Sequence, residues 1–303
     1  MFTARAEHFV LSALLAAALV SLRPAAAANF TSGAQPAARF GVHEIVLAGS
    51  GAAANPFDTL VTVRFTPPSG TAHSTAVWAF YDGDNIWRAR VYLSEVGEWR
   101  WASQCATDPA LNGRSGTFRC EPSKLRGRLL VHPKNPRQWM TEDGRWFLNL
   151  NDTSYFLLCA CDGAGAPIPD EDVQAYVKDA TERGITSFRS FIANGPRPFL
   201  GANRSDAHRW NDLFADPEFT RPSLEHLGVA DRRLRWLLEE HPDVYLQFIL
   251  FPLGKPYRTD EKIWTHMTAA QRERILRYLV ARFAAYPQIF WLIVNDAHFA
   301  PEI

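Results

Sequence analysis

Two patterns of apolar and polar residues divide the chain. Between residues 40 and 125, short runs alternate apolar and polar side chains, and turn residues such as Pro67, Gly70 and Gly83 separate them. The runs cover residues 61–65, 75–80, 87–93, 98–103 and 116–120. A period of two without helical periodicity is typical of half-buried strands. Residues 38–128 are therefore predicted to form an antiparallel β-sandwich.

After Pro133 strand-like and helix-like segments alternate. Near-continuous apolar runs cover residues 146–151, 185–192, 244–251 and 289–295, and amphipathic helices are expected near 170–183, 223–240 and 268–285. Gly184 follows the first of these helices as a plausible stop. This alternation predicts a parallel sheet with helices packed outside it. Four strands are half of the eight that close a TIM-type (β/α) barrel, so residues 134–303 are expected to be the amino-terminal half of one.

The first 28 residues have the character of a secretory signal peptide. Arg5 precedes a short apolar run at residues 9–20, and small residues follow at 25–28. The run is too short to span a bilayer, although a retained membrane anchor is the alternative. Export with cleavage near Ala28 would give a secreted or periplasmic protein. The cleaved protein is expected to have no membrane-spanning segment.

Composition narrows the class of protein further. The chain has 303 residues, about two domains in length, and 47% of its residues are hydrophobic, which argues against disorder. Its 32 basic residues balance 32 acidic ones, so charge gives no basis for a nucleic-acid partner. No dinucleotide fingerprint opens any helix, and no cofactor is expected.

The four cysteines leave several interpretations open. Cys105 and Cys120 flank a turn-rich segment, and either form a possible disulfide across a hairpin or are two small buried residues. Cys159 and Cys161 are read as packing residues or a strained local disulfide. No second Cys/His pair at zinc spacing accompanies them, so no metal is expected.

Polar and aromatic residues gather where the predicted parallel strands end. This set combines carboxylates, amides, an arginine and aromatic rings, which is the inventory of a sugar-binding site. Its members are Asn151, Asp152, Arg189, Tyr257, Trp264, Asn295, Asp296 and His298.

Asp296 is the candidate catalytic residue. It follows the apolar run 289–294 and Asn295, and an apolar wall raises a carboxyl pKa towards the range of a general acid. Glycoside hydrolysis needs two carboxyl groups, one to protonate the leaving oxygen and one to attack or to activate water. The alternative role for Asp296, and also for Asp152, is a helix cap or turn.

Other candidates have structural alternatives of their own. Arg189 is more simply a buried ion-pair partner than a ligand contact, and His298 a solvated loop residue. Four tryptophans of the predicted sandwich offer a sugar-binding platform, but period-two alternation favours a core role for them: Trp78, Trp87, Trp99 and Trp101.

The chain resembles a known group of glycosidases from about residue 39 to its end. The segment FGVHEIVLAGSGAAANPFD, followed by VTVRFTPPSG and FYDGDNIWRARVYLSEVGEWRWAS, resembles the β-sandwich domain of unknown function that precedes certain bacterial glycoside hydrolase barrels. The pieces FLNLNDTSYFL, FTRPSLEHLGVADRRLRWLL, FILFPLGKPY and RYLVARFAAYPQIFWLIVND look like the first half of the apiosidase-like (β/α)8 glycosidases. The sandwich motif is the more specific of the two.

The resemblance implies roles for individual residues. It maps the acid/base carboxylate onto Asp296, where many relatives have the longer Glu, with Asn295 beside it. It maps a sugar-binding Asp onto Asp152 and the arginine of the second strand onto Arg189. Tyr257, Trp264 and His298 are counted as further substrate contacts from their places after the predicted strands, independently of the resemblance. The family's nucleophile lies near the seventh strand, which these 303 residues do not reach.

We therefore expect a secreted glycoside hydrolase acting on polysaccharide side chains, present here as an incomplete or inactive fragment. One rival is a non-catalytic carbohydrate-binding or interaction protein in which the sandwich is the working part. Another is a truncated gene product, which the coding sequence beyond Ile303 would reveal.

Overall fold

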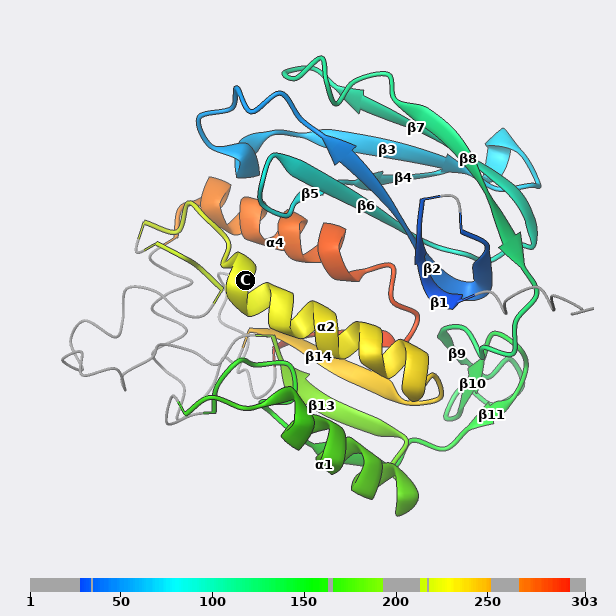
Figure 1. Ribbon diagram of the computed structural model, residues 1–303. Coiled ribbons are helices and arrows are strands. Elements are labelled where there is room, and N and C mark those ends of the chain that lie inside the picture. Colours follow the sequence, from blue (N-terminus) through cyan, green and yellow to red (C-terminus); the bar gives the residue numbers. More distant parts are fainter. Residues whose placement is uncertain are drawn as a thin grey trace, which may run out of the picture.

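The computed structural model describes residues 28–33, 35–162, 166–192, 213–216, 218–251 and 267–294. Two sheets form its outer layers, and helices α2 (Leu224–Glu240) and α4 (Ala269–Phe283) lie between them (Figure 1). Helix α1 (Asp170–Glu182) covers the parallel sheet near β13. The predicted signal peptide, residues 1–28, falls outside the described residues except for Ala28, at which the first strand begins.

The first layer is a mixed sheet that is nearly closed. Its strand order is β4-β3-β7-β8-β2-β6-β5, with β1 paired to β2, and β4 at one end of the order contacts β6 near the other. The strands are β1 (Ala28–Ser32), β2 (Ala37–Ala48), β3 (Val61–Thr66), β4 (Thr75–Trp78), β5 (Phe80–Tyr81), β6 (Ile86–Tyr92), β7 (Gly97–Cys105) and β8 (Ser115–Glu121). Two short 3-10 helices, Pro56–Asp58 and Thr71–His73, lie in its connections.

The long strand β2 joins the two halves of this sheet. Its start pairs in parallel with β8, at Ala37 and Cys120, and the part after Phe40 pairs antiparallel with β6. Phe40 has a φ of 67°, and its N–H donates to the carbonyl of Leu93 at 2.6 Å. A local bend of this kind lets one strand pass between sheets. The predicted antiparallel sandwich is therefore a single mixed sheet that curls on itself.

Alternation along β6 separates a core face from a second face. Trp87, Ala89 and Val91 point into a core that the sheet encloses, together with Val63 and Phe65 of β3. The other face of the sheet turns towards the helices, and Val42 and Phe80 on it belong to the same hydrophobic cluster as the buried residues of α2 and α4. The two layers thus share one hydrophobic cluster between them, separate from the core that the mixed sheet encloses.

Of the two interpretations of Cys105 and Cys120, the structure agrees with two buried residues and not with a disulfide. Strands β7 and β8 pair so that Cys120 faces Gly97, while Cys105 lies eight residues further along β7, about 27 Å at about 3.4 Å per residue. A disulfide needs Cα atoms within about 7 Å of each other. Both residues are buried thiols outside any disulfide, and burial raises the pKa of Cys120 to about 12. Cys159 and Cys161 are also buried, consistent with packing.

The second layer is a parallel sheet in sequence order. It runs β12 (Asn151–Thr153), β13 (Ser187–Phe191), β14 (Tyr245–Phe251) and β15 (Ile289–Val294). Capping residues and a glycine mark the ends of the helices. Thr268 and Gln271 form a capping box before α4, and Gly184, at a φ of 93°, follows the last turn of α1.

A small three-stranded sheet connects the two layers. It contains β9 (Leu129–Val131), β10 (Trp139–Thr141) and β11 (Trp146–Phe147) in the order β11-β10-β9. The predicted strand 146–151 is therefore two elements, because residues 146–147 pair with β10 and residues 151–153 pair with β13. Within the described residues, no helix is long and apolar enough to cross a membrane.

His43 of β2 makes the fold sensitive to acid. Its side chain is fully buried, stacks on Phe118 at 3.7 Å and lies with Nδ1 2.8 Å from the Thr31 hydroxyl. Its Nε2 has no hydrogen-bond partner among the described residues. Burial lowers the pKa of His43 from 6.5 to about 4, because the charged ring cannot be solvated there.

We expect the free energy of unfolding to fall as pH drops from about 6.5 to 4. In that window the unfolded chain binds a proton at His43 that the folded chain rejects, at a cost of about 1.4 kcal/mol per pH unit and about 3 kcal/mol in all. The variant His43→Gln should be less stable at neutral pH but should lose this slope. Urea unfolding at half-unit pH steps measures it. An equal slope in both proteins would contradict the assignment.

Candidate functional site

The candidate site lies at the carboxyl ends of the parallel strands. In an open or closed parallel sheet this edge carries the residues that bind and react with substrates. Five candidates fall outside the described residues and keep the status of predictions: Asn295, Asp296, Tyr257, Trp264 and His298. Asp152 and Arg189 are described.

Asp152 faces the helical side of the sheet. Its register partner on β13 is Phe188, which is buried in the cluster shared with the helices. The hydroxyl of Tyr176 on α1 donates to Asp152 Oδ2 at 2.5 Å, and the Ser154 hydroxyl lies 2.7 Å from the same Tyr176 oxygen. Burial and the neighbouring carboxylate raise the pKa of Tyr176, which keeps it a donor. Asp152 is thus held at the strand end by a hydrogen-bonded pair of hydroxyls.

Arg189 lies on the opposite face of the sheet. It pairs in register with Thr153 and with Gln247, one residue further along than the Asp152–Phe188 pair. Because successive side chains of a strand alternate between faces, Arg189 and Asp152 point in opposite directions. On the Arg189 face, Phe191 lies nearer the carboxyl edge and stacks on Tyr155 with ring centroids 4.5 Å apart. The structure therefore does not bring Asp152 and Arg189 together.

The loop after Asp152 is fixed by a residue that the sequence did not single out. Arg233 of α2 is buried and donates to the carbonyl oxygens of Leu157, Cys159 and Ile168 at 2.6–2.9 Å. Its Nε donates to Asp170 at 2.8 Å. One guanidinium group thus satisfies three loop carbonyls and ties the start of α1 to α2.

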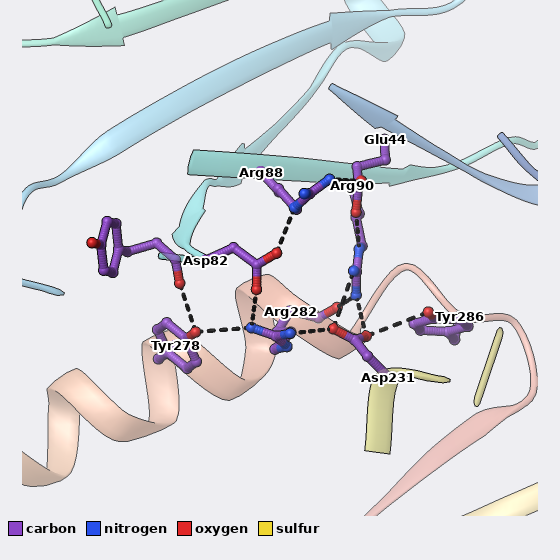
Figure 2. A network of polar contacts seen from close by, with 9 residues as sticks. Glu44, Asp82, Arg88, Arg90, Asp231, Tyr278, Arg282 and Tyr286 are labelled. Atoms are coloured by element: carbon purple, nitrogen blue, oxygen red, sulfur yellow. Dashed lines mark hydrogen bonds and ion pairs between the residues drawn. The ribbon is translucent and has the colours of Figure 1, made fainter. Parts of the chain in front are cut away.

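A second cluster of titratable residues lies between the mixed sheet and the helices. Figure 2 shows Arg90 of β6 reaching Asp231 of α2 on one side, at 2.5 Å, and Glu44 of β2 on the other, at 2.8 Å. Arg282 of α4 contacts Asp231 at 2.6 Å and Asp82 at 2.8 Å. Three carboxylates and three guanidinium groups make up this interlayer network: Glu44, Asp82, Asp231, Arg88, Arg90 and Arg282.

The network is structural in character. Burial alone would raise the pKa of Asp231, but Arg90 and Arg282 outweigh that effect and hold it below its ordinary value. The Phe80 ring lies 4.8 Å from both guanidinium groups, and Tyr286 donates to Asp231 at 3.4 Å. A carboxylate engaged in this way is poorly suited to accept a proton from a substrate. The cluster instead links the mixed sheet to α2 and α4 through the contacts of Asp231 with Arg90 and Arg282.

The sequence carries a signal for this network. The buried stripe of α4 includes Ile275, Tyr278 and Leu279 and continues at Arg282, and that of α2 includes Asp231. A charged residue on an apolar helix stripe indicates a buried partner. Tyr176 has no such signal, because it lies outside the buried stripe of α1 and is 40% exposed.

The described residues show no group of three or more His, Cys, Asp or Glu side chains placed to hold a metal ion. What the described strand ends offer is a hydrogen-bonded carboxylate, hydroxyl groups and stacked aromatic rings. These groups can bind a hydroxylated ligand, and a second carboxyl group would have to come from elsewhere for hydrolysis.

Comparison with known proteins supports this fold. Residues 37–106 match a family model described as a domain of unknown function (DUF5060). A crystal structure described as a "putative glycoside hydrolase" from Bacteroides vulgatus ATCC 8482 is 22% identical, with a TM-score of 0.65 over 88% of this chain. The chain has a glycosidase-like fold. It spans about half of that protein, 49% of its length, and at this identity the likeness concerns the fold alone.

Two further structural matches are much weaker than this one. A β-glycosidase from Bacteroides vulgatus is 12% identical, with a TM-score of 0.31 over 80% of this chain and 26% of its own. The β-glucuronidase 3 of Bacteroides uniformis is 12% identical, with a TM-score of 0.29 over 78% of this chain and 24% of its own. Neither bears on the site. No curated protein matches the sequence.

Proposed function

We propose that the parallel sheet is the first half of a (β/α)8 barrel, and that the complete protein hydrolyses glycosidic bonds in polysaccharide side chains, as apiosidase-like glycosidases do. The observation that carries the proposal is the sheet itself. Four parallel strands follow one another in sequence order, β12-β13-β14-β15, with helices packed on one face. Sequential parallel pairing with helical crossovers is how such a barrel is built.

Roles follow from position in this proposal. Asp296, directly after β15, is assigned as the general acid/base, with Asn295 as a contact to a sugar hydroxyl. Asp152 faces α1 and is held by Tyr176 at 2.5 Å, so its assigned role is to fix the loop after β12. Arg189, on the face away from the helices, is assigned the contact to substrate. The nucleophile or second base is assigned to the remaining strands of the barrel, since the matched structure is about twice as long as this chain. Export by the amino-terminal segment places the enzyme outside the cytoplasm.

The test compares two proteins. The coding sequence beyond residue 303 is determined first, and the chain is then produced alone and with any sequence that follows it. Both are assayed with 4-nitrophenyl glycosides and with side-chain-bearing plant polysaccharides. We expect hydrolysis by the longer protein and little or none by the 303-residue chain. Strong hydrolysis by the short chain, abolished by Asp152→Asn, would overturn the assignment of the second carboxyl group.

A further inference from the structure

A cleft between the mixed sheet and α4 is separate from the strand ends. Its volume is about 550 Å³, within the range of roughly 300–1,000 Å³ that small-ligand pockets occupy. Strands β4 and β6 form one wall, α4 forms the other, and Arg128 and Glu142 lie at one end. Clefts at the boundary of two packed units are frequent binding sites.

The helical wall of the cleft is made of small side chains. Ala281, Ala284 and Ala285 line it with Val280, so the helix approaches the sheet without filling the space. The adjacent residue Arg282 anchors the same turn of α4 to Asp82 and Asp231. The wall is therefore held in place by the interlayer network.

Trp78 provides an aromatic surface on the opposite wall. Of the tryptophans considered from the sequence, Trp87 and Trp99 are buried in the core, as predicted, whereas Trp78 on β4 is 45% exposed and lines the cleft. Single exposed apolar residues are ordinary on protein surfaces. An exposed indole in the wall of a preformed cleft is different, because its face can stack on the C–H surface of a sugar ring.

Ordered polar groups lie at the end of the cleft. Tyr92 donates its hydroxyl to Glu142, and the backbone N–H of Arg128 donates to the same carboxylate at 2.8 Å. The Arg128 guanidinium lies 4.0 Å from the centre of the Tyr92 ring. Glu95, also in the lining, accepts from the hydroxyl of Ser69 at 2.7 Å. Groups fixed in this way bind at a lower entropic cost than mobile ones.

The charges in the lining indicate a neutral ligand. The positive charges of Arg90 and Arg128 are balanced by the negative charges of Glu95 and Glu142. Arg90 is also paired with Glu44 and Asp231 outside the lining. Mixed donors and acceptors beside an aromatic face suit a molecule with many hydroxyl groups. We propose that this cleft binds a neutral saccharide, with a ring stacked on Trp78 and hydroxyl groups bound by Arg128 and Glu142.

Binding is tested on the whole 303-residue chain by isothermal titration calorimetry. The probes are xylohexaose, cellohexaose and arabinohexaose, with hexagalacturonate as the charged comparison. At least one neutral probe should bind, and Trp78→Ala should weaken it about tenfold or more. Trp146→Ala is the matched control, since Trp146 is 55% exposed on β11 and does not line the cleft. It should bind as the unmodified chain does.

A second variant tests the cleft without changing Trp78. Ala284→Trp adds an indole to the helical wall and should abolish binding, with the thermal unfolding midpoint reported alongside. Failure of all neutral probes to bind, equal binding by the Trp78 and Trp146 variants, or preference for hexagalacturonate would each overturn the proposal. The readout is binding rather than hydrolysis, so the outcome is independent of the function proposed for the strand ends.

Discussion

Replacing Asp231 by alanine is expected to lower the free energy of unfolding by about 3–5 kcal/mol. Asp231 is 6% exposed and accepts hydrogen bonds from Arg90 and Arg282, which come from different layers. Without its carboxylate the two guanidinium groups remain buried, and each keeps one acidic partner, Glu44 or Asp82. The large cost arises from the uncompensated charge that is left behind.

Guanidinium chloride unfolding of the wild-type chain and the variant measures this effect. Asp179→Ala is the matched control, because Asp179 also lies in a helix and pairs with Arg183, but both side chains are more than half exposed. An exposed pair of this kind contributes little to stability, because water and salt screen the two charges. The Asp231 variant should also separate the unfolding of the two layers into two transitions. A variant as stable as the Asp179 control would show that the network does not link the layers.

The second large effect rests on the proposed function. In a protein with hydrolytic activity, Asp296→Asn should reduce turnover of polysaccharide by about 10²–10⁴-fold, because the leaving oxygen loses its proton donor. The loss should be smaller with a 4-nitrophenyl leaving group, which departs without protonation. Binding of the substrate should change little, since Asn retains the shape of the side chain.

Initial rates on both substrates, with binding measured separately, check this prediction. Arg189→Ala serves as the comparison, because its proposed role predicts a weaker Michaelis complex rather than a slower chemical step. Unchanged turnover in the Asp296 variant would return this residue to the role of a helix cap.

Local periodicity predicts most of the elements correctly. The helices expected at 170–183, 223–240 and 268–285 are observed at Asp170–Glu182, Leu224–Glu240 and Ala269–Phe283. Each has an apolar stripe and a local start signal, so the information lies within the segment. The strands β3, β6, β7 and β8 follow from alternation in the same way.

Features that depend on distant partners are not predicted. The sequence does not show that β2 changes partners after Phe40, because the bend is stabilised by Leu93, which directly follows β6 and is distant in sequence. Likewise Asp152 and Arg189 both appear near strand ends, but the register Thr153–Arg189 places them on opposite faces. Register is a property of the paired strands, and a single strand does not encode it.

The alternating arginines of β6 show a related failure. Arg88 and Arg90 occupy the positions that period two assigns to solvent, yet Arg90 is 3% exposed because α2 and α4 cover this face. A charged strand face buried by another layer can be found only once the layers are assembled.

Helices α2 and α4 carry the ion-pair partners of the mixed sheet, and this limits how segments of the chain can be exchanged with those of a related protein. A crossover in the connection between β8 and β9 would separate Glu44 and Arg90 from Asp231 and Arg282. A chimaera carrying a foreign sheet with neutral residues at positions 44, 88 and 90 would leave the pair of Asp231 and Arg282 without the contact from Arg90 that ties Asp231 to the mixed sheet. The two layers must therefore be inherited and engineered together, and sequence changes at these six positions should covary across related chains.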